Sequence, residues 1–242
     1  MIQITPTPHY AGVTITGDFY NFDQLYEALH KIVGDEEKHP DYYNARLRVL
    51  GLFYDLRHAN RAHREYAFKN HGLDEETLQW MGIVSTNKNV YLSFNTYYPE
   101  ILFIIMALND FVDMYNQTDA MHSKWDLTVQ TVRKFQATVI DSLRDTLPRQ
   151  KFNSMLRNMS RYSVDFSNYF TRYLDQLNIR FLGWDQEKRF KNISIMAKRI
   201  AERGKEYQQV HEQLMQAAIK HNCDPNELVL NEDYPDYMEI DW

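Results

Sequence analysis

The pattern of apolar and polar positions predicts a mixed first half of the chain and a helical second half. Residues 2–5 (IQIT), 12–16 (GVTIT) and 88–97 (KNVYLSFNTY) alternate apolar and polar side chains, as half-buried strands do. Residues 21–34 repeat apolar side chains every three or four positions and end at a glycine. This spacing predicts an amphipathic helix with a glycine stop.

Two further segments of the first half are mostly apolar and predict buried helices. They are residues 44–63 and residues 99–117, and the second begins at a proline, which suits a first helical turn. A short helix with acidic residues in its first turn is expected within residues 73–82. The longest apolar run, ILFIIMAL, is too short to cross a bilayer.

The second half predicts three helices, the last two long. The first covers about residues 123–145, and the second begins at Pro148 and runs to about residue 178. The third carries apolar positions in steps of three and four from Phe190 to His221, including Ile200 and Leu214. Such a heptad seam predicts either a long antiparallel helical hairpin, with Leu214 and Ile200 buried against the preceding helix, or a helix that packs along a partner.

These elements predict an α+β fold, with a small N-terminal sheet and buried helices followed by an all-α region. We expect an α+β domain over residues 1–120, a helical region over residues 121–222 and an acidic aromatic tail over residues 223–242. The single cysteine, Cys223, excludes an internal disulfide. Without an apolar leader after Met1 or a spanning segment, a cytoplasmic protein without membrane contact is expected.

Charge is unevenly distributed, although the chain as a whole carries only −6. Residues 1–145 carry −6, residues 146–223 carry +7 and residues 224–242 carry −7. The basic segment favours an anionic partner, either a nucleic acid or an acidic protein surface. The residues expected to meet that partner are Arg157, Arg161, Arg172, Lys198, Arg199 and Arg203.

The acidic tail combines carboxylates with aromatic and aliphatic side chains, which is typical of a docking segment. Tyr237, Ile240 and Trp242 are the expected anchors, and the carboxylates would find a basic surface. The tail is therefore expected to dock on a basic helical surface, either its own or that of a neighbouring subunit. Docking on a neighbour would make the protein a homo-oligomer.

The stretch YDLRHANRAHREY, residues 54–66, places arginine and histidine at the end of an apolar helix. Arg57 continues an apolar stripe of that helix, so we expect it to be partly buried. A buried guanidinium needs an acidic partner, and Asp110 or Asp113 on the other apolar helix would supply it. The expected structural polar cluster is Arg57, His58, Asp110 and Asp113.

The same stretch allows a catalytic interpretation. Arg57 and His63 fall within the Arg-x4–6-His spacing of the helical HEPN ribonucleases, in which such a pair would bind phosphate and move a proton. HEPN domains are all-helical, whereas this motif lies in an α+β part. Phosphate-loop, dinucleotide and nucleophile-elbow motifs are absent, and neither a metal site nor a cofactor is expected.

Three segments together resemble an uncharacterised family of small bacterial proteins with a domain of unknown function. They are AGVTITGD, ARLRVLGLFYDLRHA and YYPEILFIIMALNDF, and the resemblance covers roughly residues 10–145. It implies a bacterial or phage-borne cytoplasmic protein and places Arg57, His58 and Asp110 in the shared pattern. It implies no activity, substrate or cofactor.

The leading hypothesis is a non-enzymatic interaction protein that acts through protein–protein contacts. Its partner would be another protein or further copies of itself, and a homo-oligomer is expected. One alternative is a HEPN-like ribonuclease that uses Arg57 and His63. The other is a nucleic-acid or phosphate-binding module that uses the basic helical region.

Overall fold

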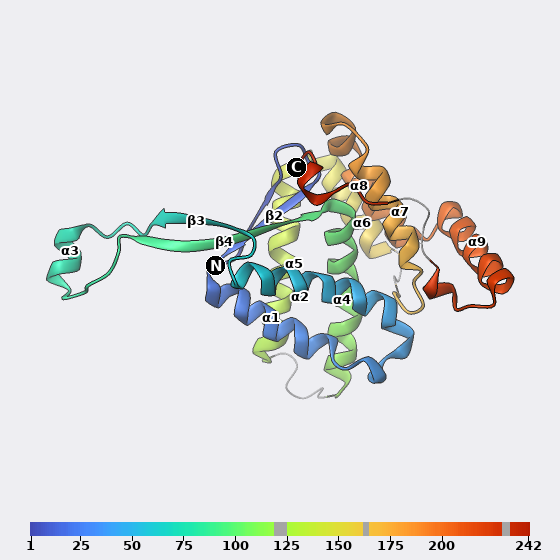
Figure 1. Ribbon diagram of the computed structural model, residues 1–242, viewed down its shortest axis with the longest axis horizontal. Coiled ribbons are helices and arrows are strands. Elements are labelled where there is room, and N and C mark those ends of the chain that lie inside the picture. The colour runs from blue at the N-terminus through green and yellow to red at the C-terminus, as the bar shows by residue number, and fades with distance from the viewer. Residues whose placement is uncertain (119–124, 162–164, 229–232) are drawn as a thin grey trace.

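A computed structural model describes residues 1–118, 125–161, 165–228 and 233–242. Figure 1 shows a body of helices packed around one end of a small sheet, with the other end of the sheet projecting away from the body. The strands are β1 (Gln3–Pro6), β2 (Gly12–Gly17), β3 (Glu65–Asn70) and β4 (Lys88–Tyr97). The helices are α1 (Phe19–Val33), α2 (Tyr43–Asn60), α3 (Glu75–Trp80), α4 (Tyr98–Thr118), α5 (Leu127–Thr146), α6 (Arg149–Arg161), α7 (Thr171–Leu182), α8 (Gln186–Glu202) and α9 (Lys205–His221).

The sheet is antiparallel throughout, in the order β1-β2-β4-β3. Val13 and Ile15 on β2 are fully buried, as their alternation predicts. Gly12 is required where β2 meets β4, because a Cβ there would lie 1.8 Å from the Thr96 carbonyl oxygen. The pattern does not predict the strand β3, which forms the outer edge of the sheet.

The hydrophobic core is continuous from β1 to α9. Helix α4 is its centre, since every residue from Ile101 to Leu108 is buried. Helices α1, α2, α5, α7 and α8 all pack around it or around one another. The expected domain boundary at residues 120/121 lies outside the described residues, and core residues on both sides of it belong to the same cluster. The α+β fold class is confirmed.

The long helical hairpin is a wrong prediction, because each expected long helix is divided. The helix expected from Pro148 to about residue 178 is α6 and α7, and the seam helix is α8 and α9. The second division occurs at Arg203, whose φ of 47° is left-handed, followed by Gly204. Helix α8 packs on α6 and α9 packs on α7. Ile200 and Leu214 are buried, as expected.

Candidate functional site

A projecting arm exposes many large apolar side chains. It consists of residues 65–91, which include β3, α3 and the first part of β4, and it extends away from the helices (Figure 1). All six residues of β3 are exposed. The arm exposes large apolar side chains along its length, with Trp80 86% exposed. These side chains are Tyr66, Phe68, Leu73, Trp80, Met81, Ile83, Val84 and Val90.

The apolar face of the arm continues the inner face of the sheet. Phe94, Leu92 and Val90 alternate on β4 and therefore share a face. Their exposed fractions rise from 2% to 6% to 46% as β4 leaves the body. Tyr66 lies opposite Leu92, and Phe68 lies opposite Val90. The face that is packed against helices inside the body is therefore uncovered in the arm.

The tip of the arm has its own ordered turn. Asp74 caps α3 by accepting a hydrogen bond from the Thr77 N–H at 2.8 Å, which is a favourable helix start. Leu78 is buried, and its carbonyl accepts from the Ile83 N–H at 2.9 Å. With Leu78 turned inward, Trp80 and Val84 remain exposed. The arm thus presents apolar groups on a folded support.

A second feature is a buried charge network beneath the C-terminal tail. Arg48 on α2 pairs with Asp175 on α7 and, at 3.6 Å, with Glu100 in the first turn of α4. Asn178 donates a hydrogen bond to Glu100 at 2.7 Å, and the Tyr234 hydroxyl donates to Asp175 at 2.8 Å. Burial raises the pKa of Glu100, and the Arg48 charge opposes that rise. Such a network ties three helices and the tail together.

A cavity of about 410 Å³ adjoins this network on the side of α2 and β4. Its charged lining consists of two arginines and two carboxylates, Arg48 with Glu100 and Arg64 with Asp55. Arg64 and Asp55 are 2.8 Å apart. Burial raises the pKa of Asp55, although the bond from Arg64 acts to lower it. Since each arginine in the lining is already paired with a carboxylate, the cavity offers no uncompensated charge to a ligand.

The tail docks on its own chain. Ile240 is buried against Ala11 and Leu182, and Trp242 packs at the edge of the same cluster. The Arg189 guanidinium donates to the main-chain oxygens of Asp241, His9 and Leu182. Arg64 lies over the Tyr237 ring at 5.9 Å. The expected anchors therefore contact mainly the N-terminal loop and the sheet end, and Arg189 on α8 and Arg64 supply basic contacts.

The expected polar cluster of Arg57, His58, Asp110 and Asp113 is a wrong prediction. Arg57 is exposed, because the buried face of α2 passes through Phe53, Leu56 and Ala59 instead. Helices α2 and α4 are antiparallel: Arg48 meets Glu100, and Tyr42 contacts Phe111. Asp110 therefore lies near the start of α2, about 22 Å along the helix from Arg57. His58 binds the Tyr54 carbonyl oxygen, and Asp113 pairs with Arg133 at 3.8 Å.

Asp110 has a different role. Its carboxylate accepts a hydrogen bond from the Phe166 N–H at 2.7 Å, which fixes the chain before α7. Burial raises the pKa of Asp110 to about 6, and this hydrogen bond opposes the rise. The carboxylates of Asp165 and Asp113 also raise it.

The candidate catalytic pair lies at the surface. Arg57 belongs to the last turn of α2, and His63 lies in the turn that leads to β3. Both side chains are exposed, and the His63 ring is 5.8 Å from the His58 ring. In the part of the chain that the structure describes, no hydrogen bond or ion pair joins Arg57 to His63. Neither of the two lines the cavity beside α2 and β4 or the cavity between α1 and α5.

The basic residues of the helical region are mostly engaged within the chain. Arg172 pairs with Asp175 at 3.4 Å and donates to the Asn226 carbonyl oxygen. Lys198 pairs with Glu202, and Arg199 pairs with Glu206. Arg203 lies over the rings of Tyr169 and Tyr207, and Arg157 borders a shallow surface hollow. The side chain of Arg161 lies outside the described residues.

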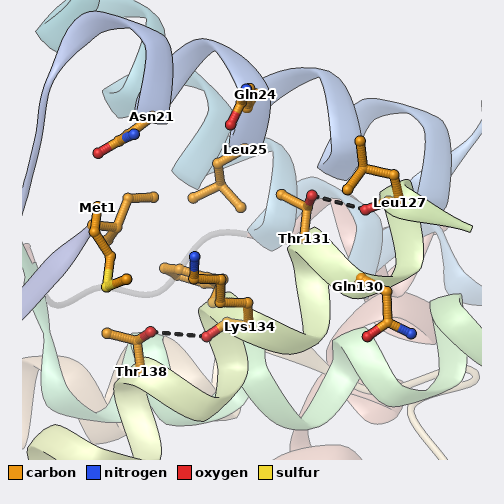
Figure 2. A pocket seen from close by; sticks show the side chains of 11 residues that line it. Met1, Asn21, Gln24, Leu25, Leu127, Gln130, Thr131, Lys134 and Thr138 are labelled. Atoms are coloured by element: carbon orange, nitrogen blue, oxygen red, sulfur yellow. Dashed lines mark hydrogen bonds between the residues drawn. The ribbon is translucent and has the colours of Figure 1, made fainter.

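A smaller cavity of about 210 Å³ lies between α1 and α5. Figure 2 shows Asn21, Gln24 and Leu25 on one side and Thr131, Lys134 and Thr138 on the other. The Thr131 and Thr138 hydroxyls donate to carbonyl oxygens of their own helix. The lining is mainly apolar and its charged side chain is Lys134, so it holds no constellation for catalysis.

Metal binding and membrane spanning find no support in the described ranges. These ranges contain no group of three or more His, Cys, Asp or Glu side chains placed to hold a metal ion. Of the helices described, none combines the length and apolar character needed to cross a bilayer.

Residues that sequence reasoning missed are those of the arm and the buried network. The signal for the arm was present as the aromatic residues Tyr66, Phe68 and Trp80 in a stretch that also contains many polar residues. The sequence signal for the network was weaker, because only the antiparallel packing of α2 and α4 brings Arg48 and Glu100 together.

Comparison of the chain with curated proteins and with solved structures gives no match. The family model described as a domain of unknown function (DUF6904) matches residues 2–242, and the chain therefore belongs to this family.

Proposed function

We propose that this chain is a non-enzymatic interaction protein, of the bacterial cytoplasm or borne by a phage, that acts through protein–protein contacts made by the arm. One observation carries the proposal: the arm exposes a set of large apolar side chains on an ordered support outside the body. Exposed apolar patches of this kind are typical of binding surfaces, because leaving them in water is unfavourable.

The charge of the arm supports a protein partner over a nucleic acid. Residues 65–91 contain Lys69 and Lys88 against Glu65, Asp74, Glu75 and Glu76. A nucleic-acid surface would require an excess of cations to meet phosphates. The aromatic and aliphatic groups of the arm are instead the anchors that dominate protein interfaces.

The test compares Trp80→Ser/Val84→Ser with the wild-type chain purified from its native cell. Native mass spectrometry would measure whether another protein, or a second copy, accompanies the chain. We expect the accompanying species to be lost in the double variant, with the melting temperature retained because both side chains are exposed.

The matched control is Trp125→Ser, which removes a tryptophan that is 87% exposed outside the arm. This control should keep the accompanying species. A wild-type chain without any partner, or a partner that survives loss of both arm side chains, would contradict the proposal.

A further inference from the structure

The outer edge of β3 has no partner strand among the described residues. The sheet order places β3 at one end, and all of its residues are exposed. Such an edge presents a row of main-chain N–H and C=O groups that can pair with another strand. An inference about its partner rests on the proposed function of the arm and extends it.

The register identifies which main-chain groups of β3 point outward. The His71 N–H donates to the Asn87 carbonyl oxygen at 3.2 Å, so these two residues continue the ladder as a hydrogen-bonded pair. Hydrogen-bonded pairs alternate along antiparallel strands. Ala67 and Lys69 therefore direct their main-chain groups to β4, and Tyr66 and Phe68 direct theirs outward.

The sequence of β3 is self-complementary about Ala67. If two copies of β3 run antiparallel with Ala67 facing Ala67, Glu65 of each copy faces Lys69 of the other. Tyr66 of each copy then faces Phe68 of the other. This arrangement pairs the main-chain N–H and C=O groups of Tyr66 in each copy with those of Phe68 in the other. These are the groups that point outward from β3, so the main-chain hydrogen bonds and the side-chain pattern require the same register.

We propose that the partner of the β3 edge is a second copy of this chain, paired antiparallel about Ala67 so that the two sheets join into one. The Glu65–Lys69 pairs fall at positions without main-chain hydrogen bonds, where facing side chains lie closest. The Tyr66–Phe68 pairs place aromatic groups opposite each other on the other face, which favours this register.

The positions of the two charged groups suit this pairing. Lys69 lies over the Tyr91 ring, with its Nζ 5.1 Å from the ring centroid, on the face that also carries Glu65. Within the described residues, Glu65 forms no ion pair of its own. The contact is isologous, so it closes on two copies and does not propagate into a fibre.

The surface area of the chain is also consistent with association. It exposes 14241 Å², whereas a compact monomer of 29.0 kDa is expected to expose about 11,400 Å². The excess of about 2,800 Å² per chain is more than the roughly 800 Å² that a standard interface buries on each partner, so the chain has exposed area to spare for association.

The test uses charge reversal and mixing of full-length chains, with mass measured by analytical ultracentrifugation. Glu65→Lys places lysine opposite Lys69 at both ends of the contact, and Lys69→Glu places glutamate opposite Glu65. Each variant alone should dimerise about tenfold to a hundredfold more weakly than the wild type. An equimolar mixture of the two variants should recover the dimer, because every facing pair is again of opposite sign.

Lys88→Glu is the control, since it changes a charge in the arm away from the outer edge. It should dimerise as the wild type does. Recovery by mixing excludes misfolding as the cause of the loss, and it is specific to the Ala67-centred register.

Three outcomes would overturn the inference: a monomeric wild type, a dimer insensitive to either reversal, or no recovery on mixing. If the wild type does not dimerise but binds a different protein, and Trp80→Ser/Val84→Ser abolishes that binding, only this inference fails. If neither dimerisation nor the binding of a different protein depends on the arm, the proposed function fails as well.

Discussion

The indole of Trp242 stacks on the phenol ring of Tyr97, with the ring centroids 5.5 Å apart and the planes inclined by 11°. Tyr97 also stacks on Tyr234, at 5.9 Å and 18°. The last residue of β4 is therefore the aromatic contact point of the tail. Stacking of this kind contributes beyond the apolar area it buries, so the tail does not depend on its charge alone.

Truncating Ile240 should release the tail from the body. Ile240→Ala removes the buried anchor between Ala11 and Leu182, and loss of a buried isoleucine costs about 2–5 kcal/mol. Hydrogen exchange of the main-chain amides of residues 233–242 would measure the release. Met238→Ala is the matched control, because Met238 is 87% exposed. Equal protection in the two variants would contradict docking through Ile240.

Replacing Arg48 should destabilise the fold far more than replacing Arg57. Arg48→Met removes the cation paired with Glu100 and one of the two cations paired with Asp175, the other being Arg172. Both carboxylates are mostly buried, so we expect a loss of about 3–5 kcal/mol. Arg57→Met changes an exposed side chain and should stay within about 0.5 kcal/mol. Urea unfolding of both variants would measure the difference, and similar midpoints would refute the assignment.

Asp110 should make stability depend on pH. Its folded pKa of about 6 is above the value of 3.8 for the free side chain, so the folded state binds the proton more tightly. The stabilising contribution is therefore complete below about pH 3.8 and is lost as the pH rises through 6. The side chain introduced by Asp110→Asn cannot ionise. As the pH rises from about 4 to about 7, the melting temperature of this variant should therefore rise relative to that of the wild type.

The substitution Asp110→Asn leaves an amide oxygen that can still accept the Phe166 N–H, so the hydrogen bond itself is retained. The control is Asp23→Asn, because Asp23 is exposed and is not among the charged groups that act on Asp110. A constant difference between Asp110→Asn and wild type across this pH range would show that burial does not perturb the carboxyl.

The ribonuclease hypothesis predicts that the chain cleaves RNA, whereas the non-enzymatic proposal predicts that it does not. We expect the purified chain to leave RNA intact. We also expect Arg57→Ala and His63→Ala to leave that result unchanged, because both side chains are exposed at the surface. Cleavage of a labelled RNA by the wild type would be measured under matched conditions. Cleavage that both substitutions abolish, with melting temperatures unchanged, would reject the non-enzymatic proposal.

The sequence predicted the buried elements well, because burial of one face repeats apolar side chains at a regular spacing along the chain. The alternation of β2 and β4 and the apolar run of α4 all match elements of the structure. The strand β3 was missed because none of its residues is buried. The alternation of Tyr66 and Phe68 with Glu65 and Lys69 is short, and the main-chain hydrogen bonds that hold β3 to β4 are not visible in the sequence.

Breaks in helices were also invisible to periodicity. The steps of three and four continue across Arg203 and Gly204, although the chain leaves the helix there. Each half has its own packing partner, so the pattern persists on both sides. The glycine was the remaining signal, but a single glycine does not decide between a continued helix and a turn.

The candidate site depended on packing that no local pattern contains. Arg57 and Arg48 both follow apolar residues on the same helix, yet only Arg48 faces α4 and α7. The direction of α4 relative to α2 decides which carboxylates each arginine can reach. That direction is a property of the assembled core.

The hydrogen bond from the His9 N–H to the Trp242 main-chain oxygen, at 2.9 Å, has a consequence for synthesis. A ribosome releases the N-terminal loop long before it makes the residues that hold this loop. Until then Arg189 has neither the Asp241 oxygen nor a docked tail beside it. We therefore expect a newly made chain to complete its helical core first and to close the loop of residues 7–12 as its last folding step.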